Sequence, residues 1–216
     1  MSTDPNLESV EGVRLHSKMH LCKWHNITDE ITHLVNSIRG GKTNTAPFPL
    51  LGCSDDPALQ LQCARNFIEH EIPSRPKLPQ GDAPWRHERL RIAYLSADFR
   101  EHAVSLLLAD VFDQHDRSRF ETFAISWGRD KPDNMRLRLE RAFSRFIDAE
   151  GMDDQDISHL LRKIQTDIAV DLMGFTRGAR PNIFALRPAP IQVNYLGYPG
   201  TIEMRIIWTI LSRIDL

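Results

Sequence analysis

The chain has 216 residues, of which 41% are hydrophobic and 26% are charged, as is ordinary for a globular protein of one or two domains. Its net charge of -2 gives no electrostatic reason to expect nucleic acid or an anionic membrane as a partner. No apolar run approaches the roughly 20 residues of a membrane helix. The acidic, polar start does not resemble a secretory signal, and the scattered Cys22, Cys53 and Cys63 indicate reduced thiols, so a cytoplasmic protein is expected.

Residues 1–72 are predicted to form a helical segment. Between residues 28 and 39 the apolar side chains recur at helical spacing, and Gly40 with Gly41 ends the helix. A second helix is predicted to begin at residues 54–57, with Ser54 or Asp55 as its cap and Pro57 in its first turn. Residues 73–88 are rich in proline and polar side chains and are predicted to be an extended linker.

After the linker, predicted strands alternate with predicted helices, which is typical of an α/β fold with a parallel sheet covered on both faces. In such a sheet, ligands bind beside the carboxyl ends of the strands. The loops that follow the strands are therefore the candidate functional segments. The predicted strands are residues 90–97, 120–127, 145–149, 167–173 and 191–196, and the predicted helices are residues 103–114, 134–143, 153–165 and 181–186.

The first such loop carries Asp98 and His102, separated by four positions at a strand-to-helix turn. The carboxylate could orient or polarise the imidazole, which can act as a base, an acid or a hydrogen-bond donor near neutral pH. The alternative is a surface histidine beside an aspartate that caps the helix.

Two further loops follow later strands. Residues 174–180 combine two glycines and two arginines, among them Arg180, ahead of a helix, and could cradle an anion. Residues 196–201 read Leu-Gly-Tyr-Pro-Gly-Thr, a turn that brings the backbone close to any ligand over the sheet edge. The alternatives are a tight turn with solvated arginines and a purely structural turn. The histidines show no metal-ligand spacing, so no metal is predicted.

Taken together, these segments identify a protein family more specifically than any one of them does. The stretches RLRIAYLSADFREHA and DLMGFTRGARPNIFALRPAPIQVNYLGYPGT resemble the catalytic region of O-GlcNAc transferases and bacterial SPINDLY-like proteins. The upstream stretches GVRLHSKMHLCKW, PFPLLG and LQLQCAR resemble the part of that family between its tetratricopeptide repeats and its catalytic domain. The resemblance covers about residues 12–201.

The resemblance implies a GT-B architecture, of which residues 89–201 would form the N-terminal Rossmann-like half and residues 1–72 the link to tetratricopeptide repeats that this chain lacks. It also implies inverting transfer of a sugar, usually from UDP-GlcNAc, to Ser or Thr hydroxyls of an acceptor protein, with neither a metal nor another cofactor. Asp98 and His102 match the family's Asp-x-x-x-His loop beside the sugar and the acceptor. The substrate-binding positions implied by the match are Arg180, Leu196, Gly197 and Pro199.

The sequence departs from the family at three places. Animal-type members carry a histidine shortly before the segment that matches PFPLL, where this chain reads Lys42 to Ala46. Arg100 and Glu101 replace small and amide residues. Residues 202–216 diverge, and one codon choice for Met204 to Leu216, read from the third nucleotide, encodes Ala-Asp-Tyr-Met-Asp-Tyr-Ile-Ile-Ala-Asp-Arg-Phe, close to the family's continuation. The expectation is a frameshifted tail and a truncated chain that is inactive alone.

Two other interpretations stay open. The chain could be a non-catalytic binding module that docks on a partner, or that supplies half of an active site to a second chain. It could also be a different nucleotide-binding Rossmann protein, although no Gly-x-Gly-x-x-Gly motif follows the strand at residues 90–97.

Overall fold

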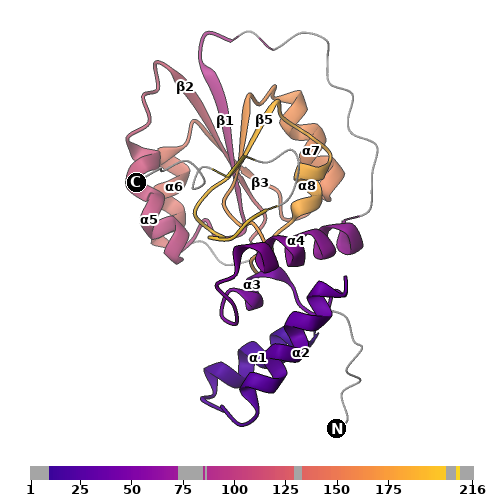
Figure 1. The fold of residues 1–216 in the computed structure, drawn as a ribbon. Helices are drawn as coiled ribbons and strands as arrows, with labels where there is room; N and C mark the ends of the chain where they lie inside the picture. Colours follow the sequence, from indigo (N-terminus) through magenta and orange to yellow (C-terminus); the bar gives the residue numbers. More distant parts are fainter. Residues whose placement is uncertain (1–9, 73–84, 86, 129–132, 203–207, 210–216) are drawn as a thin grey trace, which may run out of the picture. The chain divides into compact units, whose positions relative to one another are not determined.

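The computed structural model describes residues 10–72, 85, 87–128, 133–202 and 208–209. The chain divides into two compact units, one built from the helices α1 to α4 and one built around a β-sheet (Figure 1). Most of the predicted linker at residues 73–88 and most of the predicted tail at residues 202–216 lie outside the described residues.

The helical unit has a small apolar core. The predicted helix at residues 28–39 is confirmed as α2, and Gly40 follows its last residue. Asp56 caps α4 by accepting hydrogen bonds from Ala58 N and Leu59 N, so the prediction of Ser54 or Asp55 as the cap is wrong. Because Pro57 is the first helical residue, the residue before it takes the capping position. The helices are α1 (Val10–His20), α2 (Ile27–Arg39), α3 (Pro47–Leu50) and α4 (Pro57–Glu71), and their core contains Leu15, Leu34, Ile38, Leu50, Leu59 and Cys63.

The second unit contains a parallel sheet, as predicted. Every described strand pair is parallel, and the strand order is β3-β2-β1-β4-β5-β6. No described helix is both long and apolar enough to span a bilayer. The strands are β1 (Leu90–Ser96), β2 (Phe120–Ser126), β3 (Arg145–Asp148), β4 (Ile168–Asp171), β5 (Ile191–Asn194) and β6 (Trp208–Thr209), and the helices are α5 (Ala103–Asp113), α6 (Asn134–Ala142), α7 (Asp154–Lys163) and α8 (Pro181–Ala185).

Helices cover both faces of the sheet. Figure 1 shows α5 and α6 on one side of the strands and α7 and α8 on the other. Because side chains alternate along a strand, Ile92 and Tyr94 of β1 enter the core beneath α5 and α6, whereas Ala93 and Leu95 are buried on the opposite face. The unbroken apolar run of β1 is therefore explained by burial on both faces.

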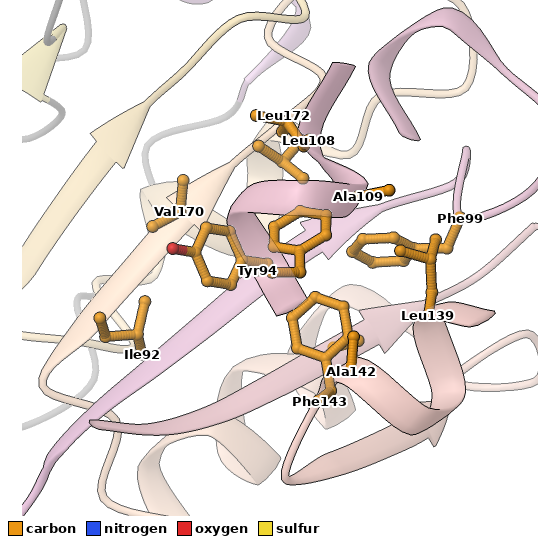
Figure 2. Close-up of a cluster of buried hydrophobic side chains, with 12 residues drawn as sticks. Ile92, Tyr94, Phe99, Leu108, Ala109, Leu139, Ala142, Phe143, Val170 and Leu172 are labelled. Carbon is orange, nitrogen blue, oxygen red and sulfur yellow. The ribbon is translucent and has the colours of Figure 1, made fainter. Parts of the chain in front are cut away.

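Aromatic rings fill the core beneath α5 and α6. Figure 2 shows the side chains of Tyr94, Phe99 and Phe143 in one cluster. The centroid of Phe143 lies 5.8 Å from that of Tyr94 and 5.7 Å from that of Phe99. Full burial of one such side chain stabilises a fold by about 1.5–3 kcal/mol. Phe99 lies three residues after the end of β1 and next to Asp98, so its burial also anchors the loop that carries Asp98.

Candidate functional site

The carboxyl ends of three neighbouring strands bring the predicted loops to one edge of the sheet. β1, β4 and β5 are adjacent, and Leu95, Asp171 and Asn194 lie level with one another in the register. The Trp127 Nε1–H, just after β2, donates a hydrogen bond to the Gly178 carbonyl oxygen at 2.9 Å. The loop after β4 therefore reaches back across the end of β1, and residues 97–102, 172–180 and 195–199 form one continuous edge.

Asp98 and His102 lie side by side in the first loop. Asp98 Oδ2 is 3.8 Å from His102 Nδ1, and Asp98 Oδ1 is 3.2 Å from a guanidinium nitrogen of Arg100. The Asp98 side chain is 14% exposed and that of His102 is 37% exposed. The distance of 3.8 Å is too long for a hydrogen bond, so the two side chains are neighbours without a hydrogen bond between them.

His102 is also the N-cap of α5. Its Nδ1 accepts a hydrogen bond from the Val104 N–H at 3.4 Å, a role that serine or aspartate usually fills. An imidazole nitrogen that accepts a hydrogen bond carries no proton, so the neutral ring carries its proton on Nε2. The structure thus assigns the cap to His102 itself, where the simpler interpretation of the sequence had Asp98 as the cap.

Three polar side chains hold this loop, and sequence reasoning missed all three. Ser96 Oγ accepts from the Asp98 N–H at 2.9 Å, and Ser105 Oγ donates to the Asp98 carbonyl oxygen at 2.6 Å. Asp133 Oδ2 accepts from the Glu101 N–H at 2.6 Å, while its Oδ1 caps α6. The hydrogen bond from the Glu101 N–H, and after it the one from the Arg136 N–H, lowers the pKa of Asp133 below its ordinary value. The sequence showed Asp133 ahead of a helical pattern, but nothing in it pointed to the partner 32 residues away.

Arg180 lies at the start of α8, and its guanidinium is bonded within the protein. Its Nε is 2.6 Å from Asp154 Oδ1 and a terminal nitrogen is 2.8 Å from the Met152 carbonyl oxygen. The guanidinium carbon also lies 5.6 Å from the centroid of the Trp127 ring. These contacts join α7, α8 and the end of β2. A contact between Arg180 and a substrate stays a prediction. Arg177, in the same loop, is exposed.

The loop at residues 196–201 packs against the loop after β4. Leu196 has a left-handed backbone (φ 67°), which is uncommon for a residue with a branched side chain. A Cβ at Gly197 would lie 1.8 Å from the Leu172 carbonyl oxygen, so only glycine fits there. Leu196 is half-buried, and Pro199 is exposed. All three predicted residues of this loop therefore lie at the same edge as Asp98 and His102, and their contact with a sugar stays a prediction.

The stretch that lacks the animal-type histidine is fixed within the helical unit. The Asn44 carbonyl oxygen accepts from the Gly12 N–H at 3.1 Å, and Asn44 Nδ2 donates to Glu11 Oε2 at 2.8 Å. Thr45 is buried against Gly12. The polar groups of Asn44 and the buried side chain of Thr45 thus join the loop to α1. In the part of the chain that the structure describes, no group of three or more His, Cys, Asp or Glu side chains could hold a metal ion.

Comparison with known proteins identifies the class. The model of glycosyl transferase family 41 matches residues 73–212. The chain belongs to glycosyl transferase family 41.

Relatives with named activities support the same assignment. The chain is 32% identical over 202 residues to the probable UDP-N-acetylglucosamine–peptide N-acetylglucosaminyltransferase SEC of Arabidopsis thaliana, covering 87% of this chain and 21% of that protein. It is 41% identical over 117 residues to the UDP-N-acetylglucosamine–peptide N-acetylglucosaminyltransferase of Caenorhabditis elegans, covering 53% of this chain and 10% of that protein. The chain therefore spans about a fifth or less of the length of these relatives.

A solved structure shows the same fold. A mutant of the Thermobaculum terrenum O-GlcNAc transferase superposes with a TM-score of 0.70 at 26% sequence identity. The match covers 92% of this chain and 38% of that chain. The expectation of an α/β fold of the O-GlcNAc-transferase type, preceded by a helical segment, is thereby confirmed.

Proposed function

We propose that the chain forms the N-terminal half of the catalytic region of a protein O-glycosyltransferase. Its substrates would be a UDP-sugar, most simply UDP-GlcNAc, and a protein that offers a Ser or Thr hydroxyl. The observation that carries the proposal is the meeting of the Asp98–His102 loop with the Leu196–Pro199 loop at one sheet edge, in a chain of family 41. The relatives named above are peptide N-acetylglucosaminyltransferases.

The proposed reaction is an inverting displacement. The acceptor hydroxyl oxygen forms a bond to the anomeric carbon of the sugar, and the bond from that carbon to the diphosphate oxygen breaks. The hydroxyl proton passes to a phosphate oxygen of the leaving UDP. The proposal includes no metal. Stabilisation of the leaving diphosphate is assigned to the second half of the GT-B architecture, since such charge stabilisation is usually a large part of the rate.

His102 would act through Nε2. Because its Nδ1 accepts from the Val104 N–H, the neutral ring offers an N–H on the side away from the helix. That donor suits a substrate oxygen and positions the acceptor or the sugar without taking a proton. Asp98, whose Oδ2 lies 3.8 Å from Nδ1, is the second proposed site residue of this loop.

The cellular setting of the proposal is the cytoplasm. Cys22, Cys53 and Cys63 are all free thiols, which suits a reducing compartment. The partners proposed are the UDP-sugar and the acceptor protein, with neither nucleic acid nor membrane among them.

The experiment compares two polypeptides. One is residues 1–216, and the other is the same sequence joined in frame to a second Rossmann-like half of family 41. Each is incubated with UDP-GlcNAc carrying a labelled sugar and with a Ser/Thr peptide, with and without EDTA. We expect transfer by the joined protein alone, unchanged by EDTA, with a β-linked product. Transfer that requires a divalent metal, or a product with retained configuration, would contradict the proposed chemistry. Tight binding of a separate second half without transfer would favour the binding-module function.

A further inference from the structure

A buried carboxylate lies beneath the loops of the sheet edge. Asp171, the last residue of β4, is 4% exposed and is the only buried acid among the described residues. Burial raises the pKa of its carboxyl group, and hydrogen bonds from Met173 N and Gly174 N lower it. A buried carboxylate is costly unless its oxygens are hydrogen-bonded, so its partners show what the group does.

The partners of Asp171 belong to the roots of two loops. Its Oδ1 accepts from the Met173 N–H at 2.8 Å and from the Gly174 N–H at 3.1 Å, and its Oδ2 also lies 3.1 Å from Gly174 N. On the other side, Asn194 Nδ2 of β5 lies 3.5 Å from Oδ2, and the Tyr195 N–H donates to the Asp171 carbonyl oxygen at 2.9 Å. One residue thus touches the start of the loop after β4 and the start of the loop after β5.

The two loops are interlocked beyond these roots. Gly174 has a left-handed backbone (φ 60°), and a Cβ there would lie 2.3 Å from the Cβ of Tyr198. The ring centroids of Phe175 and Tyr198 are 5.3 Å apart. Gly197 in turn lies against the Leu172 carbonyl oxygen. A change in the direction of the backbone at residues 173–174 must therefore displace residues 197–198 as well.

We propose that Asp171 is a positioning residue that fixes the loop at residues 172–178 and, through it, the sugar-side loop at residues 196–199. A carboxylate suits this task because both of its oxygens accept hydrogen bonds, so two successive N–H groups can be held without a competing donor. The positioning of the loops stands on the contacts of Asp171. The contribution of this positioning to sugar transfer rests on the proposed function.

Hydrogen exchange of the 216-residue polypeptide tests the positioning. Backbone amide exchange is followed by NMR in the wild type, Asp171→Ala and Asp171→Asn, and β1 amides report the stability of the sheet. Asp167→Ala is the matched control, because Asp167 Oδ2 accepts from the Arg91 N–H at 2.9 Å near the opposite end of β4. We expect Asp171→Ala to speed exchange at Gly174 and Gly197 at least tenfold more than at β1. Asp171→Asn should restore part of the protection, because its amide oxygen can still accept from Met173 and Gly174 whereas its NH2 group faces the donors Gly174 N and Asn194 Nδ2.

Two results would overturn the inference. Faster exchange at Gly174 with unchanged exchange at Gly197 would mean that Asp171 holds only its own loop. A uniform increase across β1 and both loops, matched by Asp167→Ala, would mean that the carboxylate only stabilises the sheet.

The same variants in the joined protein separate this inference from the proposed function. We expect Asp171→Ala to raise the KM for UDP-GlcNAc about tenfold with little change in the KM for the peptide, and Asp171→Asn to recover part of the loss. If the exchange results hold but the KM for UDP-GlcNAc is unchanged, the positioning of the loops stands and their assignment to the sugar fails.

Discussion

The close approach of Gly197 to the chain after β4 can be tested by adding a single methyl group. In Gly197→Ala the new Cβ would meet the Leu172 carbonyl oxygen at 1.8 Å and its carbonyl carbon at 2.7 Å. Both are backbone atoms that cannot rotate away, so the loop must withdraw by roughly 1.5 Å, and overpacking of this kind costs about 1–3 kcal/mol. We expect the free energy of unfolding of the sheet unit to fall by about 2 kcal/mol.

Gly151→Ala is the matched control for this prediction. Gly151 lies in the turn before α7, where an added Cβ would meet no atom within 4 Å, so its effect should stay within about 0.5 kcal/mol. The slowest exchanging amides of β1 give the free energy of the sheet unit separately from that of the helical unit. Equal stability of the two alanine variants would refute the interlocking of the two loops.

Three further predictions concern other parts of the chain. Asp133→Ala should lose about 1 kcal/mol at pH 7 by removing a helix cap. Because the pKa of Asp133 is lowered in the fold, the advantage of the wild type should be complete above about pH 4 and vanish as the pH falls through the folded pKa, as acid titration of thermal stability can show. In the native protein, iodoacetamide at pH 8 should modify the exposed Cys22 and spare Cys63, whose pKa burial raises to about 12, with peptide mass spectrometry as the measurement. Sequencing the gene from the Tyr195 codon onward should reveal the shifted frame, and genomic DNA without that frame would refute the frameshift.

The sequence predicted the sheet unit well because its signals are local. The apolar run at residues 90–97 and the helical spacing at residues 134–143 each identify an element without knowledge of its neighbours, and both elements were found within one or two residues of their predicted bounds. Weak or short elements were missed. α3 has 4 residues and two prolines, and β6 has 2 residues, too little for any periodic pattern.

The candidate site was predictable only in part. The strand-to-loop order placed Asp98 and His102 at the sheet edge, because the rule for parallel sheets needs no side-chain geometry. The supporting groups could not be found in this way. The predicted strand at residues 167–173 put Asp171 inside the strand, and its role depends on Gly174 and Tyr198 meeting in three dimensions.

The activity of His102→Ala in the protein joined to a second catalytic half tests the assignment of the site most directly. His159→Ala, an exposed histidine on α7, is the control. We expect kcat/KM for sugar transfer to fall about 100-fold in His102→Ala, the size typical for loss of one positioned hydrogen-bond donor, and to stay unchanged in His159→Ala. Equal activity of the two variants would contradict the assignment of the sheet edge as the place where the sugar and the acceptor meet.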